Sequence, residues 1–265
     1  MVRIHTLMLS LLAVAALAIT GCSSNKETQE ALADCAGAIA TRYNAEVENS
    51  PSFIDFLCAE AADNNINVSI GFSDSAVDVS MYSEALVQYA VAMQLKANTG
   101  KKLDLMLNTL RKCEGKLIIQ LSDTKANSRT YQIGATRLVQ LVQLPSSQLN
   151  FTAVKDNISQ IMAAECDNYR QSAGAADARF NITGGFAQYT LTFANKSAYR
   201  QFNQASLTGR YVNILKGKYE TYGSCRSYME NLLKSLQIDG YRFVYTTEQG
   251  GDSEIKAAIP WRIIN

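Results

Sequence analysis

Two small groups of carboxylates are the residues with the clearest capacity for chemistry. Asp55, Glu60 and Asp63 lie close together in the sequence, and Asp74 and Asp78 flank a predicted hairpin. Paired carboxylates can catalyse acid–base reactions without histidine, as in glycoside hydrolysis. Neither group has a recognisable sequence context, and carboxylates on helices and turns are usually exposed to solvent. The sequence therefore favours a non-enzymatic protein, and no residue is assigned as catalytic.

A second group combines basic and aromatic side chains in the C-terminal half. Between residues 196 and 234 the basic residues outnumber the acidic ones, and tyrosines are interleaved with them. Such a surface suits a carboxylated glycan, a lipid headgroup or an acidic partner, because tyrosine adds amphipathic contact area. Lys216, Lys218 and Arg226 are the predicted contacts. The alternative is a helix whose tyrosines pack in the core and whose cations form its solvated face.

The start of the chain carries the most specific motif. Arg3 precedes an apolar run from Leu7 to Ile19, which ends in the residues Ile19-Thr20-Gly21-Cys22. A short apolar segment that ends in small residues is typical of a secretory signal peptide, and it is too short for a transmembrane helix. The four residues closely resemble the lipobox of bacterial lipoprotein precursors. The resemblance implies cleavage before Cys22, a diacyl group on its sulfur and a further fatty acid, such as palmitate, on its amino group.

The resemblance also carries an expectation about location. In the enteric pattern of this family an aspartate after the lipidated cysteine retains the protein in the inner membrane, and here that position is Ser23. The expected location is therefore the outer membrane, with the protein anchored by its lipid and facing the periplasm. The periplasm is oxidising, so cysteines there tend to form disulfides.

Histidine and net charge exclude several classes of function. The only histidine, His5, lies in the segment that signal cleavage removes. A His-based triad and His metal ligands are thereby excluded, and we expect no metal and no cofactor. Removal of Arg3 leaves 25 − 1 = 24 basic residues against 24 acidic ones. This balance argues against nucleic-acid binding.

Five cysteines remain after lipidation of Cys22. Cys58 and Cys166 each fall in the predicted opening helix of one unit, and Cys113 and Cys225 each fall in a long helix before the last hairpin of that unit. The sequence therefore predicts the bridges Cys58–Cys113 and Cys166–Cys225, with Cys35 left over. The alternative is that all five are small buried apolar side chains. The cysteines are too scattered to predict a cysteine-only zinc site.

Hydrophobic periodicity predicts an α+β fold made of tandem duplicated α-ββ-α-ββ units, each with two helices packed on an antiparallel sheet. The alternative is one continuous α+β domain. Helices are predicted at 28–47, 52–62, 84–96, 101–113, 151–169, 197–206 and 210–236. Strands are predicted at 66–73, 76–82, 116–121, 130–144, 177–183, 188–193, 241–247 and 254–264.

These expectations divide the chain into a signal peptide (1–21), a lipidated tether with an N-terminal helix (22–50) and two repeats (51–148 and 149–265). The expected function is that of a periplasmic accessory or scaffold lipoprotein that binds an envelope protein. Pro260 makes the last strand an edge strand, and edge strands can accept a partner strand. Trp261 and Arg262, at the end of that strand, are the predicted partner contacts. The alternative for Trp261 is that it closes the core. The second hypothesis is a glycan- or lipid-headgroup-binding module.

Overall fold

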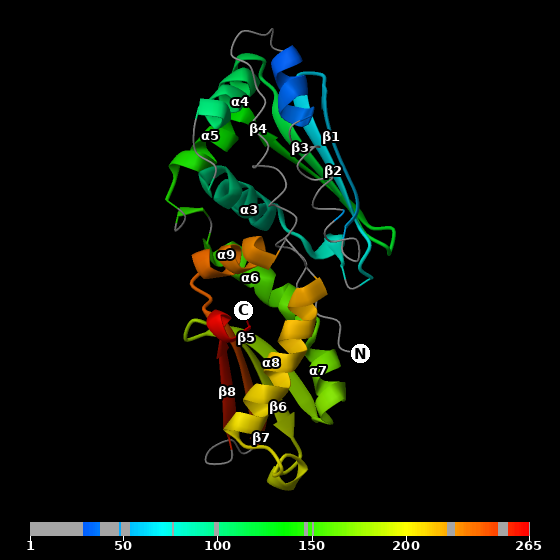
Figure 1. Cartoon of the computed structure of the whole chain (residues 1–265), viewed down its shortest axis with the longest axis vertical. Helices are drawn as coiled ribbons and strands as arrows, with labels where there is room; N and C mark the ends of the chain where they lie inside the picture. The colour runs from blue at the N-terminus through cyan, green and yellow to red at the C-terminus, as the bar shows by residue number, and fades with distance from the viewer. Residues whose placement is uncertain are drawn as a thin grey trace. The chain divides into compact units, whose positions relative to one another are not determined.

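The computed structural model describes residues 29–37, 48, 54–75, 77–97, 101–145, 148–149, 151–221, 226–248 and 254–264 (Figure 1). These residues divide between two compact units. The N-terminal unit contains the described residues up to Val154, together with α9 (Arg226–Ser235) as far as Leu232. The C-terminal unit contains Lys155–Thr221 and the described residues from Leu233 onward.

The first half of the chain contains one four-stranded sheet and the helices around it. A helix over residues 29–37 comes first, and its buried side chains include Leu32 and Cys35. The labelled elements that follow are β1 (Ile54–Ala62), β2 (Asn65–Phe72), the 3₁₀ helix η2 (Val79–Met81), α3 (Glu84–Ala97), α4 (Lys101–Lys112), β3 (Lys116–Ser122), β4 (Ser128–Gly134) and α5 (Ala135–Gln143).

The second half repeats this order. It begins with two helices, continues with a strand pair, two further helices and another strand pair, and ends with a short helix. The elements are α6 (Phe151–Ala163), α7 (Cys166–Ala173), β5 (Asp177–Thr183), β6 (Phe186–Phe193), the 3₁₀ helix η4 (Lys196–Ala198), α8 (Gln204–Thr221), α9, β7 (Gly240–Thr247), β8 (Ile255–Pro260) and α10 (Trp261–Ile264).

The two sheets have the same topology and matching hydrogen-bond registers. Their strand orders are β1-β2-β3-β4 and β5-β6-β7-β8, and in each the outer pairs are antiparallel while the central pair is parallel. Ile66 pairs with Leu117 in the first sheet, as Ala187 pairs with Tyr241 in the second. The predicted duplication of an α+β unit is therefore confirmed. The prediction that each sheet is antiparallel was wrong for the central pair, which is parallel because a helical crossover joins its strands.

Equivalent turns occupy equivalent places in the two repeats. Asp63 and Asn64, with φ of 48° and 64°, join β1 to β2, and Gly184 and Gly185, with φ of 53° and 73°, join β5 to β6. Two consecutive residues with positive φ are typical of a two-residue type I′ hairpin, for which Asp, Asn and Gly are the favoured residues. The two repeats thus use different sequences for one backbone geometry.

One face of each sheet lies in the core. In the N-terminal unit Ile66, Val68 and Ile70 of β2 are at most 1% exposed, and the residues that alternate with them are half-buried. This period of two is typical of a sheet that is covered on one face. The covered side is called the inner face below, and the opposite side is called the outer face.

The inner face of the C-terminal sheet is aromatic. Tyr211 of α8 stacks on Phe243 of β7, with ring centroids 3.5 Å apart and planes 3° from parallel. Tyr169 of α7 meets the same Phe243 edge-on at 5.2 Å, and Tyr189 stacks on it at 5.5 Å. Helices α7 and α8 therefore cover this face. Burial of each large aromatic side chain contributes roughly 1.5–3 kcal/mol.

The prediction of a helix over residues 52–62 was wrong, because this segment contains strand β1. The register between β1 and β2 shifts between Ile54 and Phe56, which marks a bulge at Asp55. A bulge reverses the alternation of faces, so Ile54 and Leu57 are both buried. Their spacing of three residues imitates that of an amphipathic helix.

Three further predictions of local structure were wrong. Residues 76–82, predicted as a strand, contain the 3₁₀ helix η2. Residues 197–206, predicted as one helix, contain only the end of η4 and the first turn of α8. The predicted strand at 130–144 is β4 followed directly by α5. Gly134 begins that helix without a side-chain cap, so the sequence carries no helix-start signal there.

Candidate functional site

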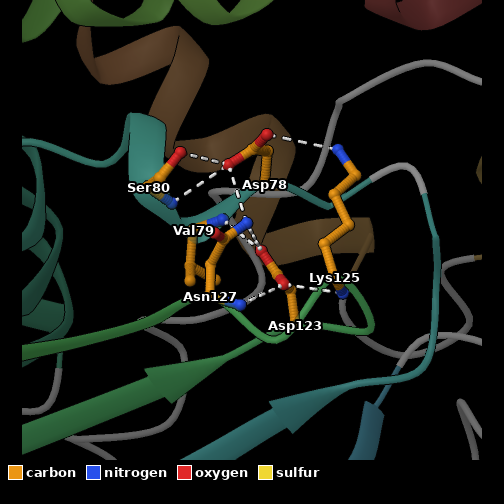
Figure 2. Close-up of polar contacts among 6 residues, drawn as sticks. All are labelled: Asp78, Val79, Ser80, Asp123, Lys125 and Asn127. Atoms are coloured by element: carbon orange, nitrogen blue, oxygen red, sulfur yellow. Dashed lines mark hydrogen bonds and ion pairs between the residues drawn. The ribbon is translucent and has the colours of Figure 1, made fainter.

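The carboxylate of Asp123, in the loop between β3 and β4, accepts four hydrogen bonds (Figure 2). Its Oδ1 accepts from the backbone N–H groups of Lys125 at 2.9 Å and Asn127 at 3.0 Å. Its Oδ2 accepts from the side-chain amide of Asn127 at 3.0 Å and from the backbone N–H of Val79 in η2 at 2.9 Å. Asp123 therefore holds the β3–β4 loop closed and attaches it to η2.

Asp78 lies beside this group and shares one donor with it. The amide nitrogen of Asn127 donates to Asp78 Oδ1 at 3.4 Å as well as to Asp123, and Lys125 Nζ pairs with Asp78 Oδ2 at 3.2 Å (Figure 2). The hydroxyl of Ser80 also donates to Asp78 Oδ1. The acceptor positions of both carboxylates are thus occupied by the protein's own donors.

The pKa values of both carboxyl groups agree with this arrangement. Burial alone would raise the pKa of Asp123, but the hydrogen bonds from Asn127, Val79 and Lys125 outweigh it and lower that pKa. The hydrogen bond from Ser80 has the largest effect on the pKa of Asp78 and lowers it, and Lys125 acts in the same direction against burial. Both groups are therefore ionised near neutral pH, which suits a structural connection better than proton transfer.

A buried ion pair lies in the C-terminal unit. Glu165, which precedes α7, is 0% exposed, and Lys218 Nζ of α8 lies 3.9 Å from its Oε2. Lys218 Nζ also donates to the hydroxyl of Tyr169 at 3.3 Å and lies 5.0 Å from the centroid of that ring. Burial lowers the pKa of Lys218 to about 8, although the charge of Glu165 opposes the shift.

This burial changes the interpretation of the predicted basic surface. Lys216 is exposed, but the side chain of Lys218 is only 12% exposed and points toward Glu165. The side chain of Arg226 is outside the described part of the structure. Tyr199, Tyr211 and Tyr219, which were expected among the cations, are at most 2% exposed. Lys218 is therefore a core residue, and the described tyrosines do not form a surface with the cations.

Trp261 and Arg262, the two residues that follow β8, were both predicted to contact a partner, but only one of them is exposed. Trp261 is 3% exposed, its indole Nε1 donates to the carbonyl of Ile238 at 2.7 Å, and its ring meets Tyr241 and Tyr219. Trp261 thus closes the core of the C-terminal unit, which corrects its prediction as a partner contact. Arg262 is exposed.

The described cysteines do not form the predicted bridges. Cys58, Cys113 and Cys166 are free thiols, which contradicts both Cys58–Cys113 and Cys166–Cys225. Cys58 is exposed on β1, whereas Cys113 follows α4 and donates to the backbone carbonyl of Leu110 at 3.5 Å. The first bridge was inferred from an opening helix at Cys58 that the fold does not contain, whereas Cys166 does lie in a helix, α7. Cys35 is buried and disulfide-bonded, whereas the predicted pairing left it as the unpaired cysteine.

The predicted signal peptide, Cys22 and Cys225 lie outside the described residues. None of the described helices combines the length and the apolar character needed to cross a bilayer. Within the same ranges, no three His, Cys, Asp or Glu side chains gather as a metal-binding group.

No protein-family model, curated protein or solved structure matches this chain. Its function must therefore be inferred from its own residues and their arrangement.

The sequence analysis missed Asp123, Glu165 and the role of Lys218. Lys218 lies seven residues after Tyr211 and three after Leu215, which places it on the buried stripe of α8 and could have identified it. The sequence signal at Asp123 is weaker: an aspartate at the start of a polar loop between two predicted strands often accepts hydrogen bonds from the backbone of that loop. Glu165 has none, because its burial depends on how α7 and α8 pack.

Proposed function

We propose that this chain is a lipid-anchored envelope lipoprotein whose folded body binds a protein partner without catalysing a reaction. The observation that carries the proposal is the sequence Ile19-Thr20-Gly21-Cys22 after a short apolar run. Acylation of Cys22 would attach the body to the outer membrane on its periplasmic side. Acylation at more than one position supplies the stable anchoring that a single chain does not.

Two features of the folded body support protein binding. Strands β1, β4, β5 and β8 each pair on one side only within the described sheets, so each leaves an edge available to a partner strand. In addition, the neighbouring carboxylates of Asp78 and Asp123 are saturated by internal donors, which argues for a binding role rather than for acid–base catalysis by this pair. Arg262, exposed beside the end of β8, is the contact that we retain.

The test is crosslinking in living cells, followed by identification of the captured protein. The lipidated chain should capture one dominant envelope protein, and Cys22→Ala should capture much less of it. Arg262→Glu should also reduce capture, while Lys216→Glu, an exposed charge reversal on α8, serves as the matched control. Capture that is independent of Cys22, or the absence of any dominant protein, would contradict the proposal.

The second candidate function, binding of a glycan or lipid headgroup, was first assigned to the helices of the C-terminal repeat. The burial of Lys218 and of the described tyrosines removes much of that surface. A different face of the same unit retains the required chemistry.

A further inference from the structure

The outer face of the C-terminal sheet carries hydroxyl, amide and cationic side chains in register. One row across the sheet is Asn181, Gln188, Arg242 and Ala258, and the next is Arg179, Thr190, Val244 and Lys256. Residues paired in this way point to the same face. Of these, Asn181, Arg179, Lys256 and Ala258 are exposed, and Gln188, Thr190 and Arg242 are half-buried. Val244, in the second row, is apolar and only 2% exposed, and Thr246, two residues further along the same strand face, is 7% exposed. The face is thus open and polar along the edge strands β5 and β8, and closely packed around Val244 of the central strand β7.

Arg242 lies near the centre of this face, and its own neighbours hold it in place. Its guanidinium lies 4.4 Å from the centroid of the Phe186 ring, and its Nη1 donates to Gln188 Oε1 at 3.3 Å. Within the described residues it forms no ion pair, so its charge is not neutralised by a carboxylate. A guanidinium that is already oriented and keeps unused N–H donors is well suited to bind a carboxylate through two hydrogen bonds.

The other two cations on the face are each paired with a nearby acid. Arg179 Nε lies 2.9 Å from Asp177, and Lys256 Nζ lies 2.7 Å from Glu254. Arg179 is 83% exposed and Lys256 is 61% exposed. Ion pairs this exposed contribute little to stability, so a bound anion can replace the acid at small cost. Arg242 is therefore the primary anion contact, and the other two cations are secondary.

The N-terminal repeat provides an internal comparison. Because the registers match, Arg242 corresponds to Ile118, and Arg179 corresponds to Cys58. Lys256 corresponds to Thr130 by the same pairing. The three cations therefore occur in one copy of a shared backbone and not at the equivalent positions of the other. The fold itself does not require them.

We propose that the outer face of the C-terminal sheet binds an anionic polysaccharide, with Arg242 receiving a carboxylate of the sugar. The amide of Asn181 and the hydroxyl of Thr190 would hydrogen-bond to sugar hydroxyls. Gln188, which donates to Thr190 Oγ1 at 3.1 Å and accepts from Arg242, would orient these two neighbours. Arg179 and Lys256 would receive further carboxylates along the chain. This assignment is independent of the lipid anchor and adds a ligand class to the proposed protein-binding role.

The composition of the face favours a polysaccharide over a membrane surface. Membrane-surface binding relies on clustered Lys and Arg with exposed apolar residues that insert among the lipids. Here Gln188 and Thr190 separate Arg179 from Arg242, and Ala258 and the buried Val244 lie between Arg242 and Lys256. Phe186 is half-buried and contacts Arg242. Separated charges among many hydrogen-bonding groups fit a polymer with carboxylates at intervals.

The test is direct binding of the full lipidated chain, in neutral detergent, to polygalacturonate. The wild type should bind it, and binding should weaken with added salt because charge contributes to it. Methyl-esterified polygalacturonate keeps the hydroxyls but lacks the charge, and it should not bind. Arg242→Gln should weaken binding by about tenfold or more, as expected for loss of a bidentate charged contact.

Matched variants keep this test independent of folding. Arg137→Gln is the control, because Arg137 of α5 also donates to a glutamine, Gln88, at 3.0 Å but lies in the N-terminal unit. It should bind like the wild type. Lys256→Gln alters an exposed side chain and should weaken binding by about threefold without affecting the fold. Fluorescence of Trp261 verifies that the C-terminal unit is folded in each variant.

Three results would overturn the proposal. The first is an absence of binding to polygalacturonate, and the second is equal binding by Arg242→Gln and the wild type. The third is displacement of the polymer by glycerol phosphate at equal charge concentration, since a small headgroup analogue cannot match a polymer that contacts several cations at once. The third result would instead assign the face to lipid headgroups.

Discussion

Replacement of Asp123 by alanine tests the polar connection between the β3–β4 loop and η2. The substitution removes a carboxylate that accepts four hydrogen bonds, three of them from backbone N–H groups. The N–H groups of Lys125 and Asn127 lie in a loop that water can reach. Val79, in contrast, is 0% exposed, so its N–H would lose its partner in a buried position.

The expected loss follows from these contacts. A buried donor left without a partner costs about 1–3 kcal/mol, and a hydrogen bond to a charged acceptor contributes about 1.5–3 kcal/mol net of exchange with water. Because the loop donors regain bonds to water, we expect Asp123→Ala to lower the free energy of unfolding by about 3 kcal/mol. Asp123→Asn retains one acceptor oxygen and should lose about half as much.

The assay is urea unfolding followed by far-ultraviolet circular dichroism, at pH 7 and again at pH 3. The pKa of Asp123 is lowered in the folded state, so the stability that its charge provides is present above the unfolded pKa and is lost as pH falls through the folded one. The difference between the wild type and Asp123→Ala should therefore shrink at pH 3. A difference below about 1 kcal/mol at pH 7, or one that grows on acidification, would show that the charge of Asp123 does not stabilise this connection.

Further predictions concern the C-terminal unit. Lys218→Met should lower the free energy of unfolding by about 3 kcal/mol, because it leaves Glu165 buried without its cation. The double variant Lys218→Met with Glu165→Leu should recover most of that loss, as measured by urea unfolding. The pKa of Lys218 is about 8 in the folded state and higher in the unfolded state, so folded Lys218 loses its proton first as pH rises. Between these two pKa values the free energy of unfolding of the wild type should therefore rise with pH relative to that of Lys218→Met. Replacing Gly184-Gly185 by Ala-Ala should lower the free energy of unfolding by about 2 kcal/mol, because both φ angles are positive. Replacing them by Asp-Asn, the pair found in the equivalent turn of the N-terminal repeat, should be tolerated. Thermal unfolding distinguishes the two variants. Gly209→Ala in α8 is the control and should stabilise the protein by about 0.5–1 kcal/mol, as a helical glycine with no atom close to the added Cβ.

The duplicated α+β architecture could be predicted from the sequence because most segments have a clear period. Strands β5 and β6 largely alternate apolar and polar residues, and α3 and α4 were predicted close to their observed bounds. Residues 52–62 were misread because the bulge at Asp55 changes a period of two into a spacing of three. Whether the central strands are parallel depends on the crossover path, which periodicity does not specify.

The candidate sites were less accessible to sequence reasoning. The basic helical segment was identified, but whether Lys218 faced solvent or Glu165 depended on the packing of α7 against α8. Arg179 and Arg242 are far apart in the sequence, and only the strand order brings them to one face. The burial of Trp261 depends on the carbonyl of Ile238, which accepts its indole N–H. Each of these roles depends on tertiary pairing, which a single sequence does not show.

Anchoring of the duplicated folded body through Cys22 is tested by the intact mass of the protein purified from membranes. The chain should begin at Cys22 and carry a diacylglyceryl group on sulfur and one fatty acid on the amino group. The same preparation of Cys22→Ala should lack all of these lipids. A wild-type chain that still begins at Met1, or one in which Cys22 is a free thiol, would rule out this anchor.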